Sequence, residues 1–321
     1  MVAALAAVAV ASVLLGSRDV GLDTIWHALT SAGAASTDET VIREMRIPRT
    51  LIGITAGAAL GLSGAILQAS TRNPLADPGI LGINGGAAAA IVLVIAITGR
   101  QSLSTYIWFA FLGAGIATVI VYSIAAIGRE GATPTKLALA GAAISAGLFA
   151  LITAVVTTNL DAFNEMRFWQ VGSLAGRYYP VLWQTLPFLV IGSVLALLTG
   201  RTLNNLALGD DIAASLGQNV RRTRFLLLAL VAIMCGAAVA ACGPIVFLGL
   251  AVPQLVRAVI GTDYRWALAF TAILAPIIML LADIVGRLVA GESELQVGVV
   301  LGALGAPVFI LLVRYRNLAE L

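Results

Sequence analysis

The chain has 321 residues, of which 60% are hydrophobic and 11% are charged, and its formal net charge is +3. A soluble domain carries about 25% charged residues, and apolar runs recur here from one end to the other, which excludes a soluble globular fold. The small positive charge lies in short polar segments and does not indicate nucleic-acid binding. Because only helices and closed barrels satisfy the backbone in lipid, and no stretch alternates like a transmembrane strand, the sequence predicts an all-α polytopic membrane protein.

About ten apolar segments approach the roughly 20 residues that a helix needs to cross a bilayer. Together they predict one transmembrane domain over residues 1–321, with an external loop at about 17–48 and a cytosolic loop at about 200–224. The first run lacks a basic n-region, so we interpret it as a span and not as a cleaved signal. We expect the spans at 1–16, 50–68, 79–98, 105–127, 136–158, 180–199, 224–242, 245–261, 266–286 and 296–313.

The distribution of basic residues predicts the orientation. An even number of crossings places both termini on the same side of the membrane. Basic residues in short loops favour the cytosolic side, and the side that holds the termini carries the larger share of them, including Arg221, Arg222 and Arg224. We therefore expect cytosolic termini in a multi-pass protein of the cytoplasmic (inner) membrane.

The cytosolic loop contains a short amphipathic segment. A pair of acids that begins at Asp210 follows a glycine, and acids in a first helical turn interact favourably with the helix dipole. Ile212 and Leu216 are four residues apart and share one helix face, and Gly217 is a C-terminal stop signal. The spacing predicts a short helix within 208–217 that lies outside the bilayer, either docked onto another protein or resting on the lipid headgroups.

Residues typical of enzyme sites are scarce. Lys136 is the only lysine and belongs to no phosphate-binding loop, and His27 is the only histidine, so an HExxH zinc motif cannot form. Cys235 and Cys242 lie seven residues apart in one apolar run, without the further cysteines or histidines that a metal site needs. The sequence therefore predicts no catalytic residues, no metal and no cofactor bound by this chain.

One acid, Asp283, lies well inside a predicted span. A secondary transporter driven by an ion gradient is the alternative from another functional class, because such proteins place ionisable residues at mid-membrane. Asp283 precedes Arg287 by four residues, which predicts an ion pair along one helix rather than an ion-coupling site.

Glycine and proline patterns indicate close helix packing and broken helices. The four-residue spacing of Gly53, Gly57 and Gly61 lets another helix approach closely. Prolines and glycines at 73–79 and 242–244 predict fixed turns, which are tolerated at membrane depth when they line a cavity or lie against protein. Spans two and seven share a small-residue texture in opposite orientation, so an inverted repeat of spans two to five and seven to ten is possible.

Several motifs occur together, and in one order, along the chain. They are 46–50 (RIPRT), 57–64 (GAALGLSG), 72–82 (RNPLADPGILG), 216–220 (LGQNV), 243–250 (GPIVFLGL), 282–287 (ADIVGR) and 305–307 (GAP). With these motifs the sequence resembles, from about Val41 to Val313, the FecCD-type permeases of binding-protein-dependent ABC importers for ferric siderophores, haem and cobalamin.

The resemblance implies a type II ABC importer architecture and a set of partners. These are a second permease subunit, with an unlike pair favoured over a homodimer, two cytosolic ATPases that use ATP and Mg, and an external substrate-binding protein. It implies that Arg46, Arg49 and Arg287 dock acidic residues of the binding protein. It also implies ATPase coupling through Leu208, Gly209, Asp210, Asp211, Ala214, Ser215, Leu216 and Gly217.

The segment 166–173 is similar to that of ferric-siderophore permeases, particularly catecholate ones, which favours a ferric siderophore over haem or cobalamin as the substrate. Gln254 and Tyr264 stand where the family commonly has histidine, and we expect both to be tolerated polar replacements near the cytosolic side. Candidates for lining the substrate path are Gln68, Asn84, Asn159, Trp169 and Gln170.

Overall fold

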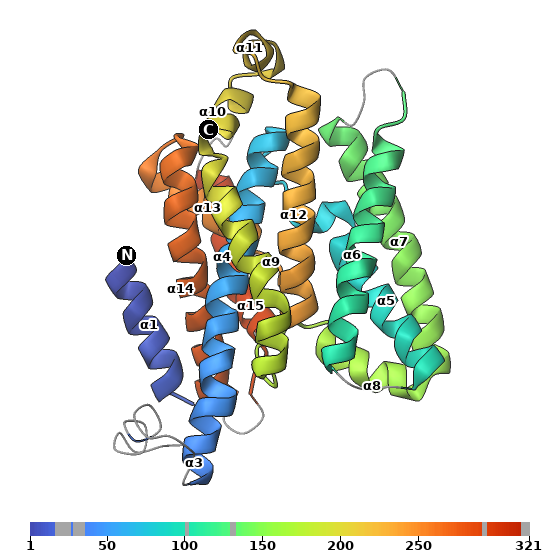
Figure 1. The fold of residues 1–321 in the computed structure, drawn as a ribbon, viewed down its shortest axis with the longest axis vertical. Helices are drawn as coiled ribbons and strands as arrows, with labels where there is room; N and C mark the ends of the chain where they lie inside the picture. The colour runs from blue at the N-terminus through green and yellow to red at the C-terminus, as the bar shows by residue number, and fades with distance from the viewer. Residues whose placement is uncertain (17–26, 28–35, 100–102, 129–132, 291–293, 316–321) are drawn as a thin grey trace.

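The computed structural model describes residues 1–16, 27, 36–99, 103–128, 133–290 and 294–315. Within these residues every regular element is a helix, and the long helices run roughly side by side along the vertical axis of Figure 1. The short helices α3 and α11 lie at opposite ends of the bundle, and we call these the α3 end and the α11 end. The predicted all-α fold is confirmed.

Apolar helices of the described residues coincide with all the predicted spans. Six are long and apolar enough to cross a membrane, and four are shorter apolar helices. In chain order they are α1 (Val2–Leu14), α4 (Ile47–Thr71), α5 (Ile83–Thr98), α6 (Leu103–Ala125), α7 (Pro134–Thr158), α9 (Tyr179–Leu198), α12 (Val220–Cys242), α13 (Leu248–Ile260), α14 (Tyr264–Ala290) and α15 (Val297–Tyr315).

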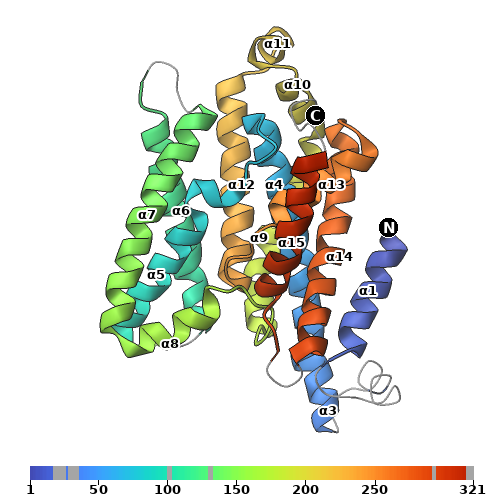
Figure 2. The same cartoon turned by 180° about the vertical axis from the view of Figure 1, so that it is seen from behind.

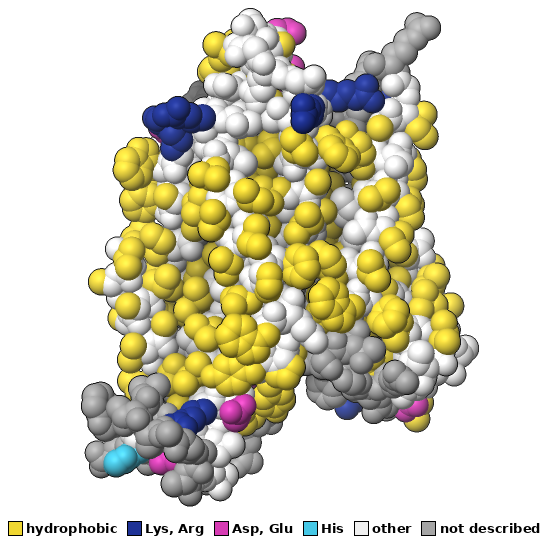
Figure 3. All heavy atoms as spheres, viewed as in Figure 1, with side chains coloured by type: hydrophobic (Ala, Val, Ile, Leu, Met, Phe, Trp, Pro, Cys, Tyr) yellow, Lys and Arg dark blue, Asp and Glu magenta, His cyan; other side chains and the backbone are white. Residues whose placement is uncertain are grey.

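Apolar side chains cover the middle of the molecule, and lysine and arginine side chains gather near the α11 end in Figure 3. Many large apolar side chains are exposed on the long helices, among them Leu112 on α6 and Leu139 and Phe149 on α7. An exposed apolar surface this extensive needs lipid or protein around it. Together with the apolar helices, it makes the chain a multi-pass membrane protein.

The chain is already helical before the predicted second span. Residues 37–48 of the expected external loop 17–48 are helical: α3 (Thr37–Thr40) and the π-helix η1 (Val41–Arg46) continue directly into α4. Residues 17–26 and 28–35 of that loop lie outside the described residues.

Two local signals explain this early start. The Ser36 hydroxyl accepts a hydrogen bond from the Glu39 amide at 3.2 Å, which caps the first turn. Pro48 lies in the first turn of α4 and has no amide to donate to the preceding turn, and the helix has the wider π form over Val41–Arg46, directly before it. Residues 37–48 were predicted as part of a loop because of their polar composition, although they form a capped helix.

Besides α3 and η1, three further short helices of the described residues lie outside the predicted spans. The expected cytosolic loop 200–224 contains α10 (Gly200–Ala207) and α11 (Asp210–Ser215), and its last residues begin α12. The sequence predicted a helix within 208–217, which is confirmed, but not α10. At the α3 end, α8 (Leu160–Trp169) follows α7 and was not predicted (Figure 1).

The glycines of α4 bring it into close contact with α13 and α14. A Cβ atom on Gly57 would lie 3.0 Å from the backbone of Pro276, and one on Gly61 would lie 2.6 Å from the Cβ of Ala275. A Cβ on Gly64 would overlap the carbonyl of Gly249 at the start of α13. The predicted close packing at these glycines is therefore confirmed, and α4 lies at the centre of the bundle.

The helices α4–α7 and α12–α15 form two halves that are interrupted at corresponding positions (Figures 1 and 2). After α4 an irregular segment and a 3₁₀ turn, η2 (Pro78–Leu81), lead into the short α5; after α12 an irregular segment leads into the short α13. Gly141 of α7 packs on the Ile80 carbonyl, and Gly305 of α15 packs on the Phe247 side chain. These correspondences agree with the predicted inverted repeat.

Candidate functional site

A cluster of charged side chains lies at the α3 end, where α1, α4 and α14 meet. Arg46 donates from Nη1 to the carbonyls of Val13 and Leu14 at 2.9 and 2.8 Å. Arg287 donates from Nη1 to the carbonyls of Ser12 and Leu15 at 2.9 and 2.8 Å. The last carbonyls of α1 have no partners within their own helix, so the two guanidinium groups cap it and attach it to the bundle.

Asp283 joins two of the arginines in this cluster. Its carboxylate is paired with Arg287 at 3.0 Å and with Arg49 at 2.7 Å. Asp283 is fully buried and Arg287 is 2% exposed. The predicted ion pair between Asp283 and Arg287 is confirmed, but the structure adds Arg49 from α4. Removing either partner of a buried pair leaves an uncompensated charge, so this carboxylate is bound to its two guanidinium groups and is poorly suited to carry a coupling ion.

Arg49 has a second acidic partner. Its Nη1 donates to Glu294 at 2.8 Å, in the segment between α14 and α15. The Arg49 side chain is 11% exposed and that of Glu294 is 26% exposed. The three arginines named for docking thus come together at one end of the molecule, but each already has partners within the chain.

At the opposite end, the short helix α11 projects from the bundle (Figure 1). Leu208, Ile212 and Leu216 are exposed, whereas Ala213 is fully buried against the bundle. Gly209 and Gly217 flank the helix at positive φ angles of 116° and 83°, which glycine adopts without the penalty that a side chain incurs. These glycines let the chain turn out to α11 and back.

Asp210 attaches α11 to the neighbouring helix ends. Its carboxylate accepts from Arg72, which follows α4, at 3.2 Å and from Arg224 on α12 at 3.1 Å. The side chains of Asp210 and Arg72 are 41% and 49% exposed. Solvent screens such ion pairs, so they orient the helix without holding it rigidly.

A third polar cluster joins α10 to the start of α14. The Asp263 carboxylate accepts from Arg265 at 2.8 Å and from Asn204 at 2.7 Å. The hydrogen bonds from Arg265, with that from Asn204, hold the pKa of Asp263 well below its usual range. Asn204 in turn accepts from the Tyr264 amide at 2.8 Å, which completes the junction.

The structure does not bring the five path candidates together. Gln68 is buried and donates to the carbonyls of Gly249 and Leu250 at the start of α13, at 3.3 and 3.1 Å. Asn84 lines a small cavity of about 10 Å³ beside Asp77 and the break before α5. Each therefore lies beside one of the two helix breaks.

The other three candidates lie on or beside α8. Asn159 caps α8 by accepting from the Ala162 amide at 2.9 Å. Trp169 is buried at the end of α8, where its carbonyl contacts Gly243 in the break between α12 and α13. Gln170 is exposed. This group lies at the α3 end, so a path through all five residues stays a prediction.

The two departures from the family pattern make specific contacts. Gln254 donates from Nε2 to the Gln68 side chain at 3.0 Å and to the Pro74 carbonyl at 2.7 Å. The Arg257 guanidinium lies 5.1 Å from the centre of the Tyr264 ring, a cation–π geometry. Gln254 therefore connects α13 to α4 and to the turn that follows α4, a role that the sequence did not reveal.

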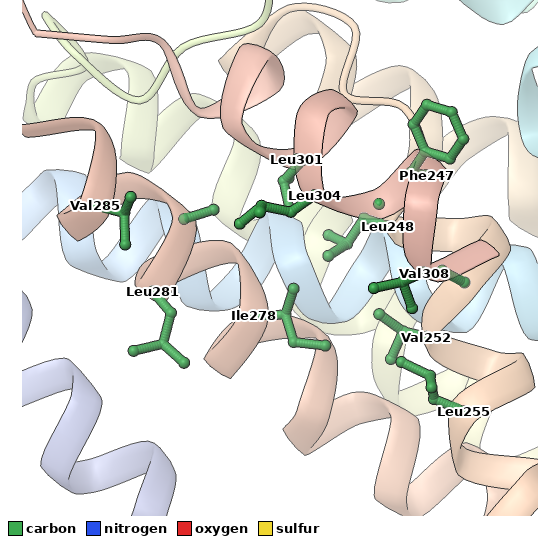
Figure 4. A pocket seen from close by; sticks show the side chains of 13 residues that line it. Phe247, Leu248, Val252, Leu255, Ile278, Leu281, Val285, Leu301, Leu304 and Val308 are labelled. Carbon is green, nitrogen blue, oxygen red and sulfur yellow. The ribbon is translucent and has the colours of Figure 1, made fainter. Parts of the chain in front are cut away.

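An apolar pocket of about 260 Å³ lies between α13, α14 and α15 (Figure 4). Its labelled side chains come from these helices and from Phe247, and all of them are hydrocarbon. Such a lining suits an acyl chain or a packed helix but supplies no group for catalysis. Within the described residues no three metal-ligating side chains lie together, and Cys235 and Cys242 are free and buried in α12.

Comparison with known proteins agrees with this architecture. The model of the FecCD transport family matches residues 4–315. The chain is 42% identical over 306 residues to the ferric enterobactin transport system permease protein FepD of Escherichia coli, covering 95% of this chain and 91% of that one. It is 37% identical to the iron(3+)-hydroxamate import system permease protein FhuB of Bacillus subtilis, covering 94% of this chain and 79% of the relative.

A solved structure described as an inward-facing conformation of a metal-chelate type ABC transporter superposes with a TM-score of 0.83 at 27% identity. The match covers 98% of this chain and 97% of the other. The family match covers nearly the whole sequence, and the fold agrees over the same length. The chain belongs to the FecCD transport family.

Proposed function

We propose that this chain is the membrane-spanning permease subunit of an ATP-driven importer that moves a ferric siderophore across the cytoplasmic membrane. The observation that carries the proposal is the 42% identity, over nearly the full length of both chains, to a ferric enterobactin permease. ATP and Mg are used by a partner ATPase, and this chain performs no covalent chemistry. A second permease subunit, favoured as an unlike chain, completes the membrane part.

Uptake measurements test the substrate class. Cells that lack the gene are given a radiolabelled ferric catecholate siderophore, a ferric hydroxamate siderophore, haem or cobalamin, each in a parallel culture. Loss of one ferric-siderophore signal, restored by the wild-type gene, is the expected result. Loss of the haem or cobalamin signal instead would assign the chain to another substrate of the family. If purified importer bound none of the four, the substrate class would be wrong.

We assign ATPase coupling to α11 and the residues that flank it. The helix projects from the bundle, and Leu208, Ile212 and Leu216 present an apolar surface that a monomer leaves uncovered. Exposed apolar patches that are surrounded by polar residues are typical of protein–protein contacts. The partner we infer is a cytosolic ATPase subunit, which would place the α11 end and both termini in the cytosol.

Substitution of the apolar face tests this assignment. Ile212→Asp places a charge on the exposed face without touching buried Ala213, so the ATPase subunit should no longer co-purify with the permease. Leu160→Asp makes the same chemical change at an exposed position on α8, at the opposite end, and should retain the ATPase. Normal ATPase recovery with Ile212→Asp would remove the assignment.

We assign binding-protein docking to the α3 end, through Arg46, Arg49 and Arg287. Support comes from their clustering at the end opposite α11 and from their charge. Guanidinium groups pair readily with carboxylates, so arginines gathered at this end would attract acidic residues of a binding protein. The path we propose begins beside Trp169 and Gln170 and continues past the two helix breaks.

A further inference from the structure

The three proposed docking arginines differ in how accessible they are. Arg46 and Arg287 are 5% and 2% exposed, and their guanidinium groups lie against the last carbonyls of α1. Arg49 is held on one side by buried Asp283 and on the other by Glu294, the more exposed acid. An incoming carboxylate therefore reaches this cluster most directly at the Nη1 atom of Arg49, where Glu294 now binds.

Glu294 has an unusual backbone conformation. Its φ angle is +38°, in the left-handed region that residues with a side chain rarely adopt. Non-glycine residues in this region are strained and persist when surrounding contacts hold them there. The contact with Arg49 is such a restraint, and the Leu295 amide adds another by donating to the Gly286 carbonyl at 3.0 Å.

The segment that carries Glu294 leads directly into the first turn of α15. There the Gly298 amide donates to the Gly172 carbonyl at 3.1 Å, and Gly298 itself packs on the Val171 carbonyl. Gly172 contacts the Pro244 carbonyl in the break between α12 and α13. A short chain of backbone contacts thus joins Glu294 to the helix break beside the proposed path entrance.

We propose that Glu294 is an internal counter-ion that occupies Arg49 until a carboxylate of the binding protein displaces it. Displacement removes one restraint on the strained residue and loosens the start of α15 where it contacts the 171–172 turn. The inference rests on the proposed docking role of Arg49 and adds a residue that regulates docking. It predicts that Glu294 competes with the partner and therefore weakens docking.

Binding measurements with matched variants test the competition. The full importer, in lipid nanodiscs, is titrated with its fluorescently labelled substrate-binding protein. Glu294→Gln should tighten the dissociation constant about two- to fivefold, the range expected from a partly screened ion pair. Glu44→Gln is the control, because it removes one negative charge from an exposed position at the same end. It should change the dissociation constant less than Glu294→Gln does.

The variant Arg49→Ala separates the two proposals. It should weaken docking, and Glu294→Gln should have no further effect in its background, because the competition requires the guanidinium. If Arg49→Ala leaves docking unchanged, the docking role fails and the inference fails with it. If Arg49→Ala weakens docking but Glu294→Gln does not strengthen it beyond Glu44→Gln, docking stands and the competition is wrong.

Hydrogen exchange of the wild-type importer gives a second readout that needs no variant. Saturating binding protein should speed amide exchange at Leu295 and Gly298, because displacement of Glu294 loosens the bonds to Gly286 and Gly172. Unchanged or slower exchange at both amides would overturn the proposed displacement.

Discussion

Two aspartates each bind a pair of arginines, one at each end of the molecule. Asp283 at the α3 end is fully buried between Arg49 and Arg287, whereas Asp210 at the α11 end is 41% exposed between Arg72 and Arg224. The chemistry is the same but the surroundings differ. Breaking a buried pair leaves charge in a low-dielectric interior, while water and salt compensate an exposed pair. The buried Asp283 cluster therefore holds α4 and α14 in a fixed arrangement, whereas the exposed Asp210 cluster orients α11 without fixing it.

The largest effect is expected from Asp283→Asn. The amide is nearly the same size but leaves Arg49 and Arg287 without their shared anion, which should cost about 3–5 kcal/mol of stability. Thermal unfolding of the purified protein in detergent, followed by tryptophan fluorescence, should show a clearly lower Tm. An unchanged Tm would mean that the buried pairs add little beyond the packing around them.

A smaller effect is expected from Asp210→Asn, which makes the same chemical change at the exposed cluster. The free energy of unfolding should fall by about 0–1 kcal/mol, and this decrease should become smaller as salt is added, because exposed pairs are screened. The same unfolding assay, run at low and at high salt, measures the loss of stability and its dependence on salt. A loss as large as that of Asp283→Asn would contradict the contrast drawn from burial.

The smallest effect concerns Asp263 and depends on pH. The folded state lowers the pKa of Asp263 from its usual 3.8 through hydrogen bonds from Arg265 and Asn204. The carboxylate therefore favours folding above about pH 4 and loses this contribution as the pH falls toward the folded pKa. The Tm of the wild type should exceed that of Asp263→Asn at pH 7, and the difference should shrink below pH 4. A pH-independent difference would contradict this origin.

Local sequence signals predicted the elements well but not the contacts between them. The α11 helix could be predicted because its acids, apolar spacing and terminal Gly217 are all within ten residues. The helix at 37–48 was not predicted because its composition is as polar as that of a loop, although Ser36 is a residue type typical of an N-cap. Asp283 and Arg287 could be paired from sequence because they are one helical turn apart.

The remaining site contacts join residues far apart in the chain. Arg49 and Asp283 are separated by 234 positions, and Gln68 and Gln254 by 186. No periodicity identifies such pairs, because it shows which face of a helix is apolar but not which helix will cover that face. Glu294 carried no motif, and its contact with Arg49 became visible only with the backbone in place.

The sequence by itself determined that the chain is a bundle of about ten membrane-crossing helices, because lipid demands long apolar segments with internally bonded backbones. It also determined the short projecting helix and, through its motifs, the family. The tertiary structure decided which charges are buried and which are exposed. Burial depends on the neighbours that folding brings together. It fixes the helices joined by the Asp283 cluster, whereas the exposed Asp210 cluster leaves α11 free to adjust.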